Sequence, residues 1–135
     1  MAIKIGVVSQ KGGVGKSTIS RLIACEYAKH DWQVKIADMD ISQHTSTDWH
    51  GRRLGNDIKP DVAVEQYGSV ARVLQDESHY DLIIFDGAPH SNKMTKQIAD
   101  SSDLVIIPTG VTVDDLRPTI RLAHELKQGG VAKTK

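Results

Sequence analysis

Short apolar segments rich in β-branched residues alternate with longer segments of mixed polarity along the chain. The apolar segments lie at residues 3–8, 34–37, 62–64, 82–85 and 104–107. Runs of this length and composition are typical of strands that are buried on both faces of a parallel sheet. The sequence therefore predicts about five parallel strands.

Two of the intervening segments repeat apolar residues with helical spacing. The two stripes consist of Ile19, Leu22, Ile23 and Tyr27, and of Leu116, Ile120, Ala123 and Leu126. We expect each stripe to face the sheet. The second helix is expected to begin near Asp114 and Asp115 and to hold Pro118 in its first turn. It should end before Gly129 and Gly130.

The alternation of strands and helices predicts an α/β fold. Connections between parallel strands are right-handed, so helices are expected on both faces of a doubly wound, mostly parallel sheet. A length of 135 residues suits one domain, and no repeat or linker divides it, so residues 1–135 are taken as a single domain. Ligands of such folds bind where loops leave the carboxyl ends of the strands.

Composition and charge exclude several classes of protein. Lys plus Arg and Asp plus Glu number 17 each, so net charge does not draw the chain toward nucleic acid or anionic lipid. The single cysteine, Cys25, cannot form an internal disulfide or a cysteine-only metal site. The first residues lack the layout of a signal peptide, and the longest apolar runs are far shorter than the ~20 residues that span a bilayer. We expect a cytoplasmic protein without a membrane partner.

A glycine-rich loop directly follows the first predicted strand and opens the first predicted helix. It consists of Lys11, Gly12, Gly13, Val14, Gly15, Lys16, Ser17 and Thr18. Glycines let the backbone N–H groups turn inward, so that a polyphosphate lies on a nest of donors at the positive end of a helix. Lys16 is expected to reach the β- and γ-phosphates, and the Ser17 hydroxyl to ligate Mg²⁺. The alternative is a plain glycine turn with a solvated lysine, which the motif spacing disfavours.

This loop carries a second lysine, Lys11, five residues before Lys16. The sequence KGGVGKST resembles the deviant Walker-A loop of the ParA/MinD class of P-loop ATPases. The resemblance implies that the chain binds ATP or ADP with Mg²⁺. It also implies that Lys11 reaches across a dimer to the nucleotide held by the partner subunit. A solvated loop charge is the alternative interpretation of Lys11.

Three aspartates follow predicted strands and support the resemblance. Asp38 and Asp40 project to the same side of the chain and look like the family's Asp-x-Asp segment. In that family the first carboxylate supports hydrated Mg²⁺ and the second positions the attacking water. In the alternative, one of the pair caps the next helix and the other is solvated. Asp86 looks like a Walker-B aspartate that holds Mg²⁺ through water, although a strand-ending acid can also begin a turn.

The resemblance covers nearly the whole chain and is most specific at residues 11–18, 38–43 and 86–89. Pro108, at the end of the fifth predicted strand, matches the family and is assigned to nucleotide binding. Family members usually have Pro-Gln directly after the second aspartate, where this chain has Ile41, Ser42 and Gln43, so the role of Gln43 stays open. His90, beside Pro89, is a further candidate because that segment should sense the γ-phosphate.

Family members also continue well beyond this length, with further strands and much of their DNA- or membrane-binding surface. We therefore expect this nucleotide-binding domain to be C-terminally truncated relative to the family, or to cover the outer edge of the strand at 104–107 by self-association.

The resemblance implies a slowly hydrolysing, ATP-dependent dimerisation switch that acts in plasmid or chromosome partition. Lys11, Lys16 and Asp40 would be its catalytic residues, and Ser17, Asp38 and Asp86 its metal residues. Expected partners are a second copy of the chain, a partition protein that stimulates hydrolysis, and non-specific DNA bound through regions outside this sequence. Two alternatives stay open. One is a nucleotide-dependent adaptor for cell-division positioning or plasmid transfer, and the other is a non-catalytic fragment that binds nucleotide.

Overall fold

The computed structural model describes residues 1–132 and contains one five-stranded parallel sheet. Its strands are β1 (Ile3–Val7), β2 (Val34–Asp38), β3 (Ala63–Gln66), β4 (Leu82–Asp86) and β5 (Leu104–Ile106). Their spatial order is β3-β2-β4-β1-β5, and all neighbouring pairs are parallel. The prediction of five parallel strands is confirmed, with boundaries that shift by no more than two residues.

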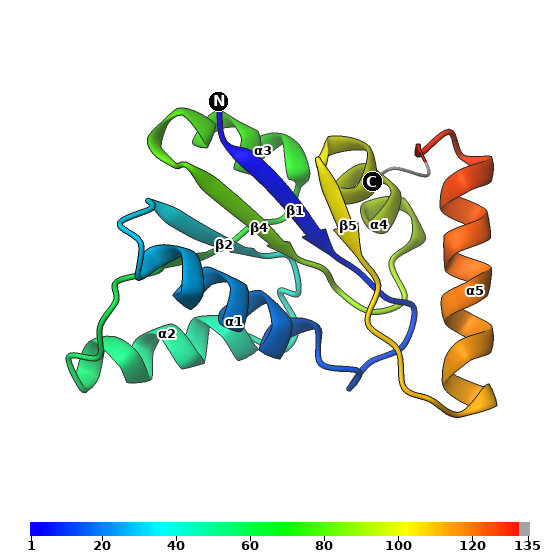
Figure 1. The fold of residues 1–135 in the computed structure, drawn as a ribbon, viewed down its shortest axis with the longest axis horizontal. Helices are drawn as coiled ribbons and strands as arrows, with labels where there is room; N and C mark the ends of the chain where they lie inside the picture. The colour runs from blue at the N-terminus through cyan, green and yellow to red at the C-terminus, as the bar shows by residue number, and fades with distance from the viewer. Residues whose placement is uncertain (133–135) are drawn as a thin grey trace.

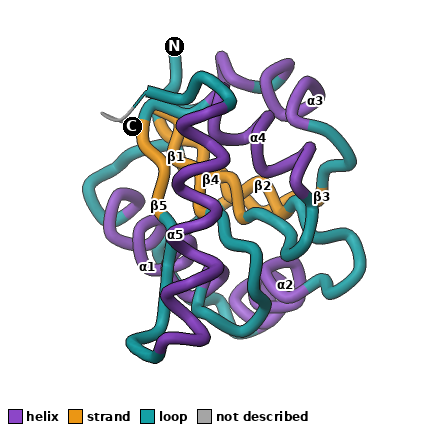
Figure 2. The backbone as a smooth tube through the Cα atoms, turned by 90° about the vertical axis from the view of Figure 1, so that its right-hand side faces the viewer, coloured by secondary structure: helices purple, strands orange, loops and turns teal. Residues whose placement is uncertain are grey.

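Within residues 1–132, four α-helices and one short 3₁₀ helix connect the strands, and a fifth α-helix follows the last strand. They are α1 (Lys16–Ala28), α2 (Thr45–Gly55), α3 (Val70–Gln75), η1 (Glu77–His79), α4 (Asn92–Ser101) and α5 (Val113–Gln128). Helices α1 and α2 cover one face of the sheet, and α3 and α4 cover the other (Figures 1 and 2). Helix α5 lies beyond β5 at one side of the sheet (Figure 1). The doubly wound α/β fold is therefore confirmed. Within residues 1–132, no helix is long and apolar enough to cross a membrane.

The centre of the sheet explains the apolar runs in the sequence. Strand β4 lies between β1 and β2, and its first four residues are completely buried. Ile83 and Phe85 join the core on the side of α3 and α4, whereas Leu82 and Ile84 join the core under α1. Because both faces are covered, both sets of alternating positions must be apolar.

The predicted apolar stripe of α1 is confirmed in part, because Ile19 and Ile23 pack against the core, but the fully buried positions of the helix lie beside this stripe. Ser20, Ala24 and Ala28 face the sheet, while Leu22 is 66% exposed and Tyr27 is also exposed. Residues spaced four apart share one helix face. Here the buried face consists of short side chains, which let the helix lie close to the strands.

Helix α5 also departs from its predicted pattern. Leu122 and Leu126 are its buried residues, whereas Leu116 and Ile120 are exposed. The helix begins at Val113, so Pro118 lies in its second turn and not in the first. The reason is that α5 lies at the side of the sheet and contacts the core through its C-terminal half.

Strand β5 forms one edge of the sheet, because β1 is its sole paired neighbour among the described strands. An apolar groove of about 430 Å³ lies between β5 and α5 and includes Val105, Ile107 and Ile120. The expected self-association over this edge stays a prediction.

Close packing at Gly6 generates a stability prediction. A Cβ at Gly6 would lie 2.7 Å from Ile98 Cγ2 and 2.8 Å from Ser102 Oγ, both on the α4 side of β1. We expect Gly6→Ala to lower the free energy of unfolding by about 1–3 kcal/mol through overpacking. Gly51→Ala is the matched control, since Gly51 lies inside α2 with open space around it. In urea unfolding the control should gain about 0.5–1 kcal/mol, and a stabilised Gly6→Ala protein would contradict the packing argument.

Candidate functional site

The loop between β1 and α1 has an open, left-handed glycine backbone. Gly13 and Gly15 have φ angles of 72° and 95°, a region that favours glycine. A Cβ at Gly12, Gly13 or Gly15 would meet nothing within 4 Å, so one side of the loop is open. Gly15 is the N-cap of α1 and provides no side chain to bind the first N–H groups of the helix. These N–H groups are therefore available to an anion.

A cavity of about 310 Å³ lies over this loop. Its lining comes from the loops after three strands and consists of Gly12, Gly13, Gly15, Lys16, Ser17, Thr18, Asp38, Asp40, Gln43, Thr45, Gly87 and Pro89. Most of the residues predicted from the motifs thus lie around one cavity. Val14, Lys11, Pro108 and His90 are not part of its lining, and Asp86 lies buried at the end of β4.

Lys16 is 7% exposed and begins α1. Its Nζ donates to Ser9 Oγ and to the carbonyl oxygen of Lys11, both at 3.2 Å. Both oxygens are uncharged, so these contacts leave the positive charge unneutralised. Burial lowers the pKa of Lys16, and the carboxylates of Asp86 and Asp40 oppose that shift. An anionic ligand at this position would offset the cost of burial.

Two buried carboxylates lie next to each other on β2 and β4. Asp38 and Asp86 are opposite each other in the strand register and are 2% and 3% exposed. Burial raises the pKa of both groups. Hydrogen bonds from Ser17 and Ser46 oppose the shift at Asp86, and a hydrogen bond from the Asp40 backbone N–H opposes it at Asp38.

This donor set suits a hard cation that is shared with phosphate. Ser17, Asp38 and Asp86 offer oxygen donors, as Mg²⁺ prefers, close to the phosphate loop. Within residues 1–132, no group of three or more His, Cys, Asp or Glu side chains could hold a metal ion alone. Mg²⁺ sites are commonly completed by water and substrate phosphates, so the residues present fit such a site.

Asp40 lies at the mouth of the cavity in a local turn. Its Oδ1 accepts hydrogen bonds from the Ser42 backbone N–H at 3.1 Å and from Ser42 Oγ at 2.6 Å. Helix α2 has His44 as its N-cap, and the His44 side chain makes no capping hydrogen bond to the helix. Neither Asp38 nor Asp40 therefore caps the next helix, which was the alternative interpretation of this pair.

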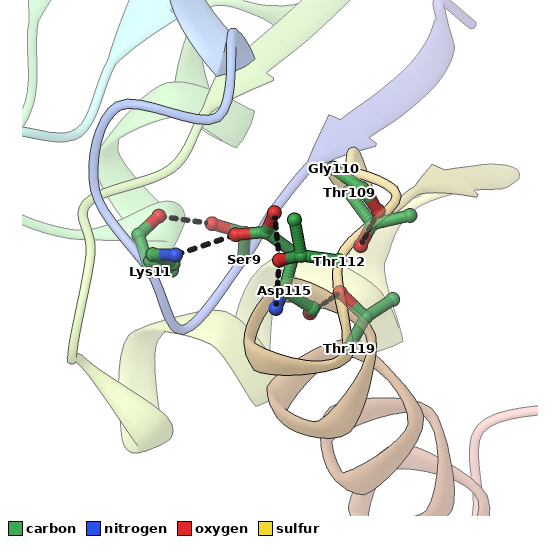
Figure 3. Close-up of polar contacts among 7 residues, drawn as sticks. All are labelled: Ser9, Lys11, Thr109, Gly110, Thr112, Asp115 and Thr119. Carbon is green, nitrogen blue, oxygen red and sulfur yellow. Dashed lines mark hydrogen bonds and ion pairs between the residues drawn. The ribbon is translucent and has the colours of Figure 1, made fainter.

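Lys11 points away from the cavity and toward α5 (Figure 3). Its Nζ lies 2.5 Å from Asp115 Oδ1. The Thr112 hydroxyl donates to Asp115 Oδ2 at 2.7 Å and also caps α5 by accepting from the Asp115 backbone N–H. Asp115 raises the pKa of Lys11, and Lys11 lowers the pKa of Asp115. A Cβ at Gly110 would lie 2.7 Å from Asp115 Cγ. The loop can therefore lie this close to the carboxylate because residue 110 is glycine.

Several residues around the site were not found by sequence reasoning. The spacing of Thr112 and Asp115 is that of a helix capping box, a signal that could have marked the start of α5. Ser46 carries no comparable signal, since its importance depends on burial beside Asp86. Arg21 stacks on Trp49 at 5.5 Å, and its buried Nε and Nη2 have no hydrogen-bond partner among the described residues.

The buried charge of Asp86 generates a second prediction. The raised pKa means that burial outweighs the nearby cations Lys16 and Arg21, so the ionised form destabilises the metal-free fold. In metal-free buffer, we expect Asp86→Asn to raise the melting temperature by about 2–6 °C, which corresponds to ~1 kcal/mol. Asp57→Asn, at an exposed position, is the control and should leave the melting temperature unchanged. A lower melting temperature for Asp86→Asn would contradict this account.

Comparison with known proteins adds evidence on the family. The family model described as ParA, NUBPL iron-transfer P-loop NTPase, matches residues 1–101. An iron-sulfur cluster carrier protein from Clostridium perfringens (strain 13 / Type A) is 50% identical over 38 residues, which are 28% of this chain and 13% of that protein.

Solved structures share the fold over nearly the whole chain. The septum site-determining protein MinD from Pyrococcus horikoshii OT3, complexed with Mg-ADP, matches with a TM-score of 0.74 and 20% identity over 98% of this chain and 68% of its own. The ParA of pNOB8, bound to nonspecific DNA, matches with a TM-score of 0.72 and 19% identity over 97% of this chain and 62% of its own. A plasmid partition protein from Borrelia burgdorferi gives 0.72 and 19%, over 96% of this chain and 74% of its own.

The chain thus spans 62–74% of the length of these three structures and 13% of the curated carrier protein. At such identities the structural matches show the fold. The family model, by contrast, matches three quarters of the sequence, over residues that include the glycine loop, Asp38 and Asp86. The chain belongs to the ParA family of P-loop NTPases.

Proposed function

We propose that this chain binds ATP with Mg²⁺ and acts as a slowly hydrolysing dimerisation switch of the ParA type. The observation that carries the proposal is the set of groups around the cavity of about 310 Å³. An uncapped helix N-terminus and the unneutralised ammonium of Lys16 meet two buried carboxylates there. Together they match a nucleotide polyphosphate that is bound with a divalent cation.

Each residue of the cavity receives a role in this proposal. The loop N–H groups and Lys16 bind the phosphates and stabilise the charge that develops during phosphoryl transfer. Ser17, Asp38 and Asp86 hold Mg²⁺, which when bound neutralises phosphate charge. Asp40, oriented by Ser42, positions the attacking water.

Lys11 has its proposed role between two copies of the chain. In the single chain its side chain is paired with Asp115 and remains 49% exposed. Ion pairs exposed to solvent contribute little stability, so Lys11 can exchange Asp115 for a phosphate of the partner's nucleotide at small cost. In this proposal, the ion pair between Lys11 and Asp115 therefore belongs to the monomeric state of the switch.

The biological setting is proposed from the family. We place the chain in the partition of plasmids or chromosomes, in the cytoplasm, with a stimulating partner protein and non-specific DNA. The descriptions of a plasmid partition protein and of ParA bound to nonspecific DNA support the partition role and the DNA binding. Iron transfer, named in the family description and in the carrier relative, is the second candidate. Iron–sulfur clusters are held by several thiolates, whereas this sequence has Cys25 alone. We therefore assign to this chain the binding and hydrolysis of nucleotide, and not the binding of an iron–sulfur cluster.

Lys16 provides the test of nucleotide binding. Lys16→Ala removes charge-assisted contacts worth about 1.5–3 kcal/mol each, so we expect the Kd for ADP to rise at least tenfold. Titration calorimetry measures the change directly. Lys29→Ala, at the exposed C-terminal end of α1, is the control and should bind ADP normally. Unchanged ADP affinity in Lys16→Ala would refute the site.

Lys11 provides the separate test of dimerisation. Lys11→Ala should keep the ADP affinity of the single chain and abolish ATP-dependent dimerisation and turnover, as followed by analytical ultracentrifugation and phosphate release. Asp115→Asn frees Lys11 while preserving the shape of the cap, so dimerisation should begin at about twofold to fivefold lower ATP concentration. If Lys11→Ala loses ADP binding as strongly as Lys16→Ala, then Lys11 is a local phosphate contact and the proposed exchange is wrong.

A further inference from the structure

The first turn of α2 directs two consecutive hydroxyls at the two buried carboxylates. Ser46 Oγ donates to Asp86 Oδ2 at 2.8 Å, and Thr47 Oγ1 donates to Asp38 Oδ2 at 3.4 Å. Ser46 is completely buried. A hydroxyl removed from water in this way needs a partner inside the protein, and the Asp86 carboxylate provides it at a normal hydrogen-bond length.

These hydroxyls do not serve the helix as caps. The N-cap of α2 is His44, which makes no side-chain hydrogen bond to the helix, and Ser46 lies inside the first turn. Serine in a helix is less favourable than alanine unless its hydroxyl has a specific partner. The partner of Ser46 is Asp86, 40 residues away in the sequence.

Asp86 receives hydroxyl donors from two helices, Ser17 of α1 and Ser46 of α2. In the proposed function the Ser17 oxygen is a metal ligand, so its interaction with Asp86 changes when the cation binds. Ser46 has no such second role in the proposed function, so it can keep its hydrogen bond to Oδ2 when the cation binds. The orientation of the Asp86 carboxylate toward the cation therefore depends on Ser46.

Helix α2 is itself fixed relative to the phosphate loop. The Trp49 ring stacks with Arg21 of α1 at 5.5 Å and with Arg53 at 4.9 Å. One turn before Trp49, Ser46 contacts β4. The first turn of α2 is thus held between α1 and the carboxyl end of β4, which gives the Ser46 hydroxyl a fixed direction.

We propose that Ser46 is a positioning residue that orients Asp86 for the divalent cation, with Thr47 in a weaker, equivalent role at Asp38. The inference rests on the proposed function, because it needs a cation at Asp86. The motif residues Ser17, Asp38 and Asp86 place the cation site between the phosphate loop and the ends of β2 and β4. The inference adds helix α2 to this site. Partners that orient metal-binding carboxylates change metal affinity about 10- to 100-fold when they are removed.

The test measures the Kd of ADP over a magnesium series, from metal-free buffer to saturation. For Ser46→Ala we expect the Mg²⁺ concentration at half-maximal enhancement of ADP affinity to rise about tenfold. The metal-free ADP affinity should stay within a factor of two, since Ser46 does not touch the phosphate loop. Saturating Mg²⁺ should restore the ADP affinity of the unmodified chain. A purely structural role would instead weaken ADP binding at every Mg²⁺ concentration.

Two further variants complete the design. Ser20→Ala is the matched control, because Ser20 is also completely buried but donates to the Lys16 carbonyl and not to a carboxylate. It should leave the Mg²⁺ midpoint unchanged. Ser46→Cys keeps the shape of the side chain, with a somewhat larger sulfur atom and a weak donor, and leaves no cavity if the alanine variant fails to fold. Its midpoint should fall between those of serine and alanine.

The outcomes separate this inference from the proposed function. An unchanged midpoint in both Ser46 variants, together with loss of the Mg²⁺ effect in Asp86→Asn, would overturn the role of Ser46 and leave the cation site intact. A normal Mg²⁺ effect in Asp86→Asn would overturn the cation site itself and the positioning role with it.

Discussion

The desolvation of two neighbouring carboxylates is the constraint on which the rest of the site depends. Asp38 and Asp86 lie opposite each other on β2 and β4, and both are almost completely buried. Hydroxyl and backbone N–H donors offset part of this cost, and Lys16 and Arg21 contribute nearby positive charge, yet burial still raises both pKa values. Apolar side chains in these places would favour stability. A bound cation would offset this cost, and this connects the fold to the proposed ligand.

Local motifs and burial on two faces made most of the fold predictable. Strand β4 is recognisable because its first four residues are apolar and enter the core on one face or the other. The glycine loop is recognisable because its conformation requires glycine at positions 13 and 15. The fully buried positions of α1 were not predictable from hydrophobicity, although Ile19 and Ile23 of the predicted stripe do pack against the core. Ser20 and Ala24 face the sheet because the helix lies close to it, which leaves the larger Leu22 in solvent.

The parts of the site that escaped prediction depend on contacts between distant segments. Asp38 and Asp86 were assigned to one metal site through the family resemblance, whereas the strand order that makes them neighbours, with β4 between β1 and β2, is not stated by the linear sequence. The ion pair between Lys11 and Asp115 joins residues that are 104 positions apart. Ser46 lies in a polar stretch that resembles an ordinary helix start, so its role follows from burial and not from its type.

The two lysines of the loop differ in their surroundings, and this difference separates binding from association. Lys16 is buried between the phosphate loop and the carboxylates, so its charge acts where solvent screens it little. Lys11 is half exposed and paired with α5, which contacts the core mainly through Leu122 and Leu126 in its C-terminal half. Breaking a solvent-screened ion pair at the other end of α5 leaves that core contact intact. In the proposed function, ligand affinity is therefore set at Lys16 and the cation site, while Lys11 would change partners without disturbing the fold.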